Sequence, residues 1–316
     1  MKRQHEFIIK RLINLVPVIL GATIIVYFLI NMTGDPVRIM LGPMASQEEV
    51  MEARRSLGLD QPIYIRYFYW LGDVLQGDLG VSIRKGKPVL TMILERLGNT
   101  LILTISALII AIGVAIPAGV ISAVKQDTWI DNVSRFISIF WISMPMFWLG
   151  LILIMIFGVH LEMFPVYGMN GPLLSVNGLR SLVLPAVTLG LPQVALYTRL
   201  TRSSMLDELR EDYVVTARGK GIKEWTVVVW HSLRNALIPV ITMISLRVPW
   251  LFGGSVLVEE VFAWPGIGRL LANSILQRDY PVVMGIVLVI IVLVVIVNLI
   301  ADIIYAYLDP RIDYDS

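Results

Sequence analysis

The sequence contains no cysteine and little charge. With no cysteine among its 316 residues, disulfides, thiolate metal ligands and cysteine nucleophiles are excluded. Charged residues make up 16% of the chain and hydrophobic residues 56%, whereas soluble domains average about 25% and about 45–50%. A mean hydropathy of +0.75 cannot be reconciled with a surface that faces water. The composition therefore predicts an integral membrane protein.

Neither sign of charge dominates, and the motifs of ATP or hydrolytic chemistry are missing. There are 26 basic and 24 acidic residues, a net charge of +2. This small excess of positive charge gives no indication of nucleic-acid binding. The nearest approach to the phosphate-binding loop G-x-x-x-x-G-K-[ST] is Gly80 to Pro88, which has five residues between its glycines and proline at the hydroxyl position. No H-E-x-x-H, G-x-S-x-G or metal-ligand cluster is present. The chain is therefore predicted not to be an enzyme and to hold no cofactor or metal, so any ATP and Mg would be bound by partner subunits.

Long apolar runs are what the sequence does contain. A hydrocarbon core of about 30 Å needs roughly 20 apolar residues per helix, and six runs meet this length. They do not alternate as barrel strands would, so the predicted class is an all-α integral membrane protein with six transmembrane helices. The first run is too long for a signal peptide and no small-residue cleavage site follows it, so it is interpreted as a retained anchor. The predicted spans are Leu12–Gly34, Leu97–Val124, Phe136–His160, Ser181–Thr198, Asn235–Val258 and Tyr280–Ala301.

Basic residues in the short flanks and loops predict the orientation. With the N-terminus inside, the inner segments hold 14 Lys and Arg, whereas the two short outer loops hold three, Arg180, Arg269 and Arg278. The segment from Asn31 to Gly98 holds eight, but segments beyond about 60 residues largely escape the rule. Both termini are therefore predicted to be cytoplasmic, in the cell membrane of a prokaryote. The predicted organisation is a cytoplasmic stub with the first span (1–34), an external folded segment (35–96), a five-helix core (97–305) with a cytoplasmic loop at about 202–235, and a cytoplasmic tail (306–316).

The external segment carries signals of folded helices. Ser46 followed by Glu49 is a capping-box pattern, and Gly58 is a plausible stop. A second helix is predicted to open around Asp60 to Pro62 and to end at Gly77. Its apolar stripe either packs on the protein's own outer surface or forms a docking platform for an external partner, and consists of Ile63, Tyr67, Trp70, Leu71 and Val74.

The cytoplasmic loop between spans four and five is the most informative segment. A charged, helix-prone stretch from Asp207 to Asp212 is followed by Thr216-Ala217-Arg218-Gly219-Lys220-Gly221, whose small residues allow a tight turn and the close approach of another surface. A second helix is predicted from Ile222 to Leu233, with Trp225 and Trp230. Either a partner covers these tryptophans, or both helices lie on anionic lipid.

Motifs along nearly the whole chain point to one family. In the loop they are Glu211-Asp212-Tyr213, Thr216 to Gly221, and His231-Ser232-Leu233-Arg234-Asn235-Ala236-Leu237-Ile238-Pro239. Elsewhere they are Gly34-Asp35-Pro36, Gly58-Leu59-Asp60-Gln61-Pro62, Gly77-Asp78-Leu79-Gly80, Ser143-Met144-Pro145, Leu184-Pro185-Ala186, Phe262-Ala263-Trp264-Pro265-Gly266-Ile267-Gly268-Arg269, Arg278-Asp279-Tyr280-Pro281 and Leu308-Asp309-Pro310-Arg311. Each is weak alone, but together and in order they are specific. The chain resembles ABC importer permeases, and more narrowly the first ("B-type") permease of the dipeptide/oligopeptide/nickel importer family.

The resemblance implies a type I ABC importer permease fold and a coupling role for the loop. In that family a short loop helix sits in a cleft of a cytoplasmic ATPase and transmits its closure to the spans. The general motif begins Glu-Ala-Ala, whereas this chain has Val215-Thr216-Ala217, which puts the contact of each residue in doubt. The resemblance places the ATPase-coupling role on Glu211, Asp212, Tyr213, Thr216, Ala217, Arg218, Gly219, Lys220 and Gly221.

One ionised residue, Arg247, is predicted deep within a span. Placing arginine there costs at least about 2.5–3.5 kcal/mol on insertion scales, so it is expected to face a wet cavity or a counter-charge. Pro249, Gly253 and Gly254 follow and would let the helix kink and line a translocation path. Arg247 is either a structural pair with a carboxylate of a neighbouring subunit or a cavity cation that attracts a substrate carboxylate.

The outer end after span five is predicted to form a receptor-facing mouth. Glu259 and Glu260 either meet the external receptor or cap that end of the span. Trp264 and Arg269 belong to the family motif, and Ile267–Gln277 is predicted to be a short outer helix whose gating role is suggested only by the family.

Together these features predict the permease subunit of an ATP-driven, binding-protein-dependent importer. Its expected partners are a second homologous permease, two cytoplasmic ATPases, an external substrate-binding protein and the lipid bilayer. Di- or oligopeptides are the leading substrates, with nickel chelates or glutathione as alternatives. A self-sufficient secondary transporter is a distant alternative, because it would place several ionisable groups within its spans. A purely structural subunit would not need a kinked span that bears arginine.

Overall fold

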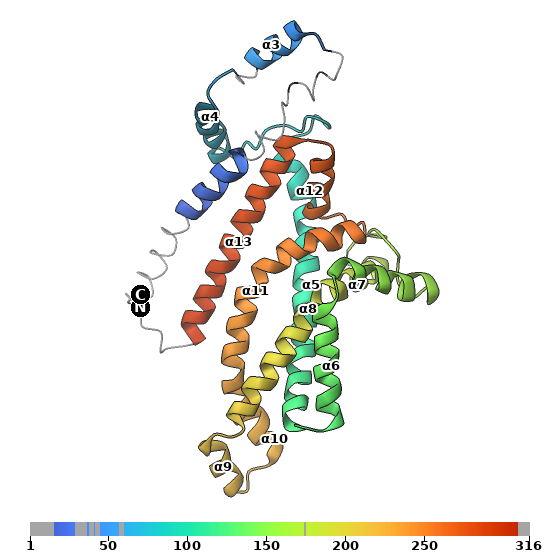
Figure 1. Ribbon diagram of the computed structural model, residues 1–316, viewed down its shortest axis with the longest axis vertical. Coiled ribbons are helices and arrows are strands. Elements are labelled where there is room, and N and C mark those ends of the chain that lie inside the picture. Colours follow the sequence, from blue (N-terminus) through green and yellow to red (C-terminus); the bar gives the residue numbers. More distant parts are fainter. Residues whose placement is uncertain are drawn as a thin grey trace. The chain divides into compact units, whose positions relative to one another are not determined.

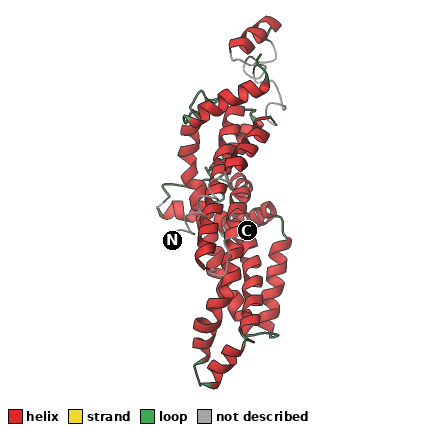
Figure 2. Cartoon of the chain, turned by 90° about the vertical axis from the view of Figure 1, so that its left-hand side faces the viewer, coloured by secondary structure: helices red, strands yellow, loops and turns green. Residues whose placement is uncertain are grey.

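A computed structural model describes residues 16–28, 37, 41, 45–56, 60–173 and 175–308, without the side chains of residues 53, 302 and 304–308. Regular structure in this part of the chain is helical, and Val81 and Pro88 form an isolated antiparallel bridge (Figure 2). The predicted stop at Gly58, the basic N-terminal flank and the motif residues 34–36, 58–59 and 309–311 lie outside the described residues.

Figure 1 shows the helices of the chain with their labels. A helix over Val16–Phe28 belongs to the first predicted span. The labelled helices are α3 (Gln47–Ser56), α4 (Ile63–Leu75), α5 (Val89–Val124), α6 (Trp129–Ser143), α7 (Met146–Leu153), the π-helix η1 (Ile154–His160), α8 (Val176–Glu208), α9 (Asp212–Gly219), α10 (Glu224–Thr226), the π-helix η2 (Val227–Ser232), α11 (Leu233–Val261), α12 (Ile267–Leu276) and α13 (Tyr280–Leu308).

Four stretches among the described residues are long and apolar enough to cross a membrane: α5, α8, the run from Glu224 to Val261, and Tyr280–Ala301 of α13. The third predicted span is not one straight helix, because α6 and the α7–η1 pair meet at an angle of 108°. Met144 adopts an extended conformation with φ −82° and ψ 132°, as expected of a residue before proline. Counted as one span, the bent pair gives a fifth.

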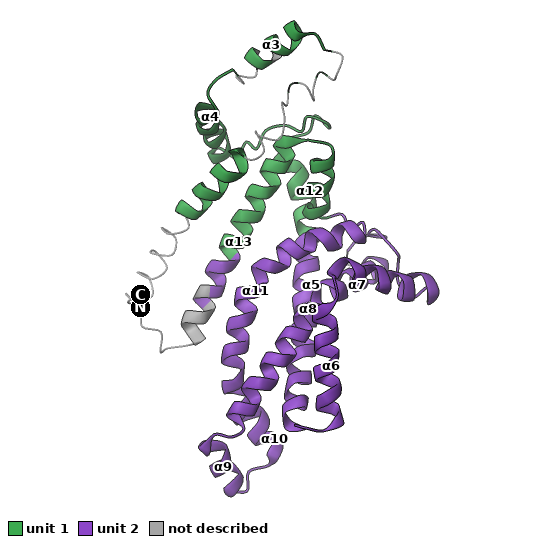
Figure 3. Ribbon diagram, viewed as in Figure 1, with its two compact units in different colours: residues 1–98, 266–296 green, residues 99–265, 297–316 purple. Residues whose placement is uncertain are grey.

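The chain divides into two compact units, residues 1–98 with 266–296 and residues 99–265 with 297–316 (Figure 3). The first, unit 1, is built around a core that joins the start of α5 to α12 and the first half of α13. Among its buried side chains are Val89, Ile93, Ile267 and Ile286.

The predicted external helices are present in unit 1. The Ser46 amide donates to Glu49 Oε2 at 2.8 Å, and the Glu49 amide donates to Ser46 Oγ at 3.2 Å, so the capping box is confirmed. In α4 the predicted stripe faces inward: Tyr67 is buried and shares a 2.9 Å hydrogen bond with Thr23, and its ring lies 5.5 Å from Tyr27. Packing on the protein's own surface is therefore the interpretation that the contacts support.

The glycine-rich loop before α5 folds around a carboxylate of its own chain. Asp279, which is buried, accepts hydrogen bonds from the Ser82 hydroxyl and from the amides of Ile83 and Arg84, at 3.0 and 3.4 Å. The amides that a phosphate-binding loop would offer to a nucleotide are thus occupied by Asp279, in agreement with the absence of the ATP motif.

Small residues bring α5 and α8 into close contact in unit 2. Ala107, Ala111, Ala115 and Gly119 recur every four residues on one face of α5, and each is buried. A Cβ atom at Gly119 would lie 2.6 Å from Thr201 Cβ, and one at Gly190 would lie 2.8 Å from the Ala107 carbonyl oxygen. In a membrane no hydrophobic effect drives helices together, so they associate through close packing of their backbones at small residues.

Candidate functional site

The cytoplasmic loop forms a small folded unit around α9. Val214, Ala217 and Val227 are buried together with Ile222 against them, which fixes α9 on the following π-helix. Figure 1 shows α9 and α10 at the same end of unit 2 as the turn between α5 and α6. Both segments were predicted to be cytoplasmic, and their shared end agrees with that orientation.

A glycine ends α9 as a Schellman motif. Gly221 has φ +73°, its amide donates to the Arg218 carbonyl at 2.9 Å, and the Ile222 amide donates to the Ala217 carbonyl at 3.3 Å. The turn is shorter than the predicted Thr216–Gly221. Thr216 to Gly219 belong to helix α9, and only Lys220 and Gly221 form the turn.

Polar contacts hold α9 to its neighbours. Arg218 makes a two-pronged ion pair with Glu224, with nitrogen–oxygen distances of 2.7 and 3.1 Å. The Tyr213 hydroxyl donates to Glu208 and accepts from Asn235 Nδ2 at 3.2 Å. Burial, followed by the hydrogen bond to Glu208, raises the pKa of the Tyr213 phenol, which therefore stays protonated at neutral pH.

Most of the predicted coupling residues lie at the surface. Ala217 is the exception, since it is buried in the small core beneath α9. Val215 and Trp225 are also exposed, at 61% and 73%, so the loop presents apolar side chains among its charges. The exposed predicted residues are Glu211, Asp212, Tyr213, Thr216, Arg218, Gly219, Lys220 and Gly221.

The predicted separate helix from Ile222 to Leu233 is corrected by the structure. Helical residues run without interruption from Glu224 through η2 into α11, forming one stretch of 38 residues. The apolar residues Val227 to Trp230 are followed within three residues by Leu233 and then by Ala236 and Leu237. No glycine or proline lies between them to interrupt the helix. α9 is therefore joined to the start of this membrane-spanning helix by only the short turn of residues 220–223.

Arg247 is half-buried on α11, beside α8. Met243 and Ile244, one turn earlier on α11, pack against the buried cluster that includes Tyr197 of α8. Pro239 and Pro249 both lie inside α11, and Figure 1 shows this helix bent. The bend agrees with the predicted kink.

A row of buried polar side chains on α8 was not predicted from the sequence. Gln193, Tyr197 and Thr201 are spaced four residues apart, so they share one helix face. All three are buried, and none of the atoms Gln193 Oε1, Tyr197 Oη and Thr201 Oγ1 has a hydrogen-bond partner among the described residues. Polar atoms in a membrane span are costly unless hydrated or functional. The four-residue spacing within an apolar run was the signal that could have identified this row.

The predicted path residues of α11 divide between two faces. Gly253 has no atom within 4 Å of an added Cβ, whereas a Cβ at Gly254 would meet Leu189 at 3.3 Å and Met146 at 3.4 Å. Gly253 lies on the exposed face with Leu246, Trp250 and Leu257. Gly254 is therefore a packing residue, and the open face of α11 is centred on Gly253.

At the outer end of α11 the predicted mouth residues also divide. Glu259 and Trp264 are fully buried: Glu259 Oε1 accepts from the Thr100 hydroxyl at 2.6 Å, and Trp264 Nε1 donates to the Asn99 carbonyl at 3.0 Å. These two side chains join α11 to α5 and do not reach the surface of the described chain, contrary to the expected receptor-facing position. Glu260 is exposed and Arg269 is partly exposed. The predicted short outer helix is present as α12.

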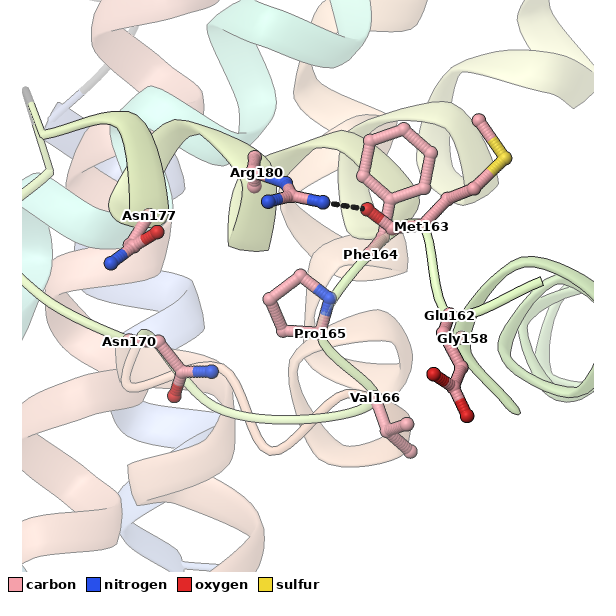
Figure 4. A pocket seen from close by; sticks show the side chains of 9 residues that line it. All are labelled: Gly158, Glu162, Met163, Phe164, Pro165, Val166, Asn170, Asn177 and Arg180. Carbon is pink, nitrogen blue, oxygen red and sulfur yellow. Dashed lines mark hydrogen bonds between the residues drawn. The ribbon is translucent and has the colours of Figure 1, made fainter. Parts of the chain in front are cut away.

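The loop between η1 and α8 encloses an outer pocket of about 390 Å³ (Figure 4). Arg180 Nη2 donates to the Met163 carbonyl at 2.6 Å and ties the loop to α8. Glu162, Asn170 and Asn177 also line the pocket. Glu162 has φ +49°, an uncommon conformation for a residue other than glycine.

A buried ion pair at the inner ends of α6 and α8 was not predicted. Asp131, with no exposed surface, accepts from Arg202 Nε at 2.6 Å and Nη2 at 2.7 Å. The Ser122 hydroxyl at 2.6 Å and the Asp127 amide at 3.1 Å also donate to this carboxylate. The pair ties the α5–α6 turn to the helix that leads into α9.

The sequence matches known membrane transport components over nearly its whole length. Residues 115–314 match the family "Binding-protein-dependent transport system inner membrane component", and residues 4–104 match the N-terminal family of such membrane components. Among curated relatives, the oligopeptide transport system permease protein AppB of Bacillus subtilis is 45% identical over 98% of this chain and 99% of its own. The dipeptide transport system permease protein DppB of Alkalihalophilus pseudofirmus is 39% identical, and the glutathione transport system permease protein GsiC of Escherichia coli 40% identical, each over 98% of this chain and 99% of its own.

A solved structure shares the fold. The inward-facing MetNI methionine ABC transporter aligns with a TM-score of 0.57 at 17% identity, over 69% of this chain and 96% of that one. At this identity the match supports the helical permease fold alone. Within the part of the chain that the structure describes, no group of three or more His, Cys, Asp or Glu is arranged to hold a metal.

Proposed function

Because this chain belongs to the family of binding-protein-dependent transport system inner membrane components, we propose that it forms one half of the translocation path of a peptide importer. As a family member it is a multi-pass inner-membrane permease of a bacterial ABC importer and not the ATPase subunit. Such a component works with an ATPase, a second permease and a binding protein. The finer assignment is to two ATPases and a second permease homologous to this chain.

The observation that carries the coupling role is the position of α9 directly before the continuous helix formed by α10, η2 and α11. The Schellman turn at Gly221 and the Arg218–Glu224 pair hold α9 in a fixed position. Its exposed residues are then presented to an ATPase cleft, and closure of that cleft would move the inner end of α11. Two states of one element, biased by ATP-dependent closure of a partner, are what an importer requires.

For the path itself, we assign the exposed face of α11 around Gly253, together with Arg247. This face is apolar, and Arg247 lies half-buried at its flank. A guanidinium there can bind a substrate carboxylate. Glu260 and Arg269 remain the proposed contacts with the binding protein.

Peptides are the proposed substrate class because AppB and DppB are named for oligopeptide and dipeptide transport. GsiC is named for glutathione, which is itself a tripeptide with free carboxylates, so glutathione is the second candidate. Nickel chelates are the third.

The test is uptake by the purified complex in proteoliposomes, with ATP inside and the cognate binding protein outside. We expect ATP-dependent uptake of a labelled tripeptide, with labelled glutathione and a nickel–histidine chelate measured in parallel. Uptake of the chelate alone would contradict the substrate class. Uptake driven by an ion gradient without ATP would contradict the importer mechanism and favour a secondary transporter.

A further inference from the structure

A basic groove lies between α6 and α8 at their inner ends. It measures about 290 Å³ and is lined on α6 by Ser134, Arg135 and Ser138 and on α8 by Arg199, Arg202 and Ser203. Because Thr198 of α8 also lines it, its walls carry three guanidinium groups and four hydroxyls. Neither the coupling loop nor the proposed path uses this groove.

The groove lies at a defined depth. Arg135 is six residues into α6, which starts at the cytoplasmic turn, and Arg202 is six residues before the cytoplasmic end of α8. At 1.5 Å per residue, each arginine lies about 9 Å from the inner end of its helix. Ile139 and Ile142 also line the groove and lie about 6 and 10 Å further towards the membrane centre. Arg199 lies nine residues before the end of α8, at about the depth of Ile139, so the guanidinium groups extend to the first isoleucine and Ile142 lies deeper.

The charge in the groove is not balanced. Asp131 neutralises one guanidinium, since it is paired with Arg202 at 2.6 Å and lies 3.5 Å from Arg135. Among the described residues, no carboxylate lies within 4 Å of Arg199, whose side chain is exposed. An excess of positive charge beside apolar residues fits an anion that carries a hydrocarbon chain.

We propose that this groove binds the phosphate headgroup of an anionic phospholipid from the inner leaflet, with the upper acyl carbons against Ile139 and Ile142. Basic pockets between membrane helices on the cytoplasmic side bind anionic headgroups in this way. The hydroxyl of Ser203 and the guanidinium of Arg199 donate to the phosphate oxygens, while Arg202 stays on Asp131 and the Ser138 hydroxyl stays on the Ser134 carbonyl. Because Arg202 belongs to α8, the bound lipid would steady the helix that leads to α9.

Native mass spectrometry of the intact importer complex tests the proposal. The complex is incubated with equal amounts of dioleoylphosphatidylglycerol and dioleoylphosphatidylcholine, and the lipid retained per complex is counted. We expect the wild type to retain phosphatidylglycerol, and R135Q/R199Q to lose about 25-fold in that preference, roughly fivefold for each arginine. K125Q removes a basic charge from the exposed α5–α6 turn outside the groove and should behave as wild type. R199Q alone, at an exposed side chain, gives about a fivefold loss if the double variant does not assemble.

Three results would overturn the proposal. Equal retention by R135Q/R199Q and K125Q would show that the groove does not select the lipid. Displacement of phosphatidylglycerol by inorganic phosphate, but not by chloride at the same ionic strength, would assign the groove to a free anion. Loss of the second permease from R135Q/R199Q, with no lipid bound to the wild type, would make the groove a subunit interface.

Discussion

At the residue scale, Arg247 is where a substrate would be recognised. Replacing Arg247 with Gln removes the guanidinium that can pair with a peptide carboxylate, and a hydrogen bond to a charged group contributes about 1.5–3 kcal/mol. We expect R247Q to lower uptake of peptides with a free C-terminal carboxylate by about tenfold or more. Peptides with an amidated C-terminus serve as the matched substrate, since their uptake should fall much less, and R247K should restore part of the loss. Equal loss of complex assembly and of uptake for both substrates would instead make Arg247 a structural partner.

The second residue-scale prediction concerns the Asp131–Arg202 pair. Removing one partner of a buried ion pair leaves the other charge unpaired and costs about 3–5 kcal/mol. R202M should therefore lower the thermal unfolding midpoint of the detergent-extracted complex well below that of K125Q, whose side chain lies on the nearby exposed turn. The double variant D131L/R202M, which leaves no orphaned charge, should recover part of the loss. If R202M unfolds at the same temperature as K125Q, the pair does not hold α8 to the α5–α6 turn.

Sequence reasoning found the residues whose chemistry is evident from local spacing. Ser46 and Glu49 are three residues apart, and a single arginine in an apolar run is conspicuous. Asp131 and Arg202 could not be paired in this way, because 71 residues separate them and each is unremarkable in its own flank. The burial of Glu259 and Trp264 was equally hidden, since their partners Thr100 and Asn99 belong to a helix more than 150 residues away.

At the scale of elements, the crossing of α5 and α8 depends on small residues. A leucine at Gly119 would clash with Thr201 and with the Thr198 carbonyl, whereas an added Cβ at Gly113 on the same helix meets no atom within 4 Å. We expect G119L to reduce the amount of assembled complex in membranes severalfold by forcing the two helices apart, and G113L to leave it near wild type. Quantitative blotting of the complex after gentle extraction measures this difference. Equal yields from both variants would contradict the close contact.

The turn that ends α9 gives the second element-scale prediction. Gly221 adopts φ +73° with no atom within 4 Å of an added Cβ, so valine there is strained by its backbone alone, by roughly 1–2 kcal/mol. G221V should weaken α9 and reduce the stimulation of ATP hydrolysis by the binding protein and its substrate severalfold, while the complex stays assembled. G86V places the same strain at φ +62° in the external loop and should leave the stimulation unchanged. If the two variants behave alike, the order of α9 is not needed for coupling.

Which elements exist was largely predictable, whereas how they join was not. Hydropathy identified α5, α8, α11 and α13 because a membrane span needs an uninterrupted apolar run. The 108° bend at Met144 and Pro145 depends on how α7 packs against α8 and α11, which one local proline does not specify. Likewise, the junction of η2 and α11 carries Arg234 and Asn235, which suggested a loop, while the helical backbone continues through them.

At the scale of the whole molecule, this chain is one subunit of a binding-protein-dependent ABC importer. Its apolar composition, the absence of an ATP-binding motif and family membership over nearly the full length agree that it forms a membrane path without hydrolysing ATP. The extensive exposed apolar surface of α6 and α11, including Phe136 at 70% and Leu246 at 67%, must be covered by lipid or by a second permease. We propose that the ATPases act through α9, on the basis of its loop geometry and the family.

The most direct test is to extract the chain gently from its native membrane and to quantify by mass spectrometry what co-purifies. We expect a second permease and ATPase subunits in stoichiometric amounts. Recovery of the chain alone, or as a homo-oligomer without an ATPase under mild conditions, would contradict the coupling role of α9 and favour a secondary transporter.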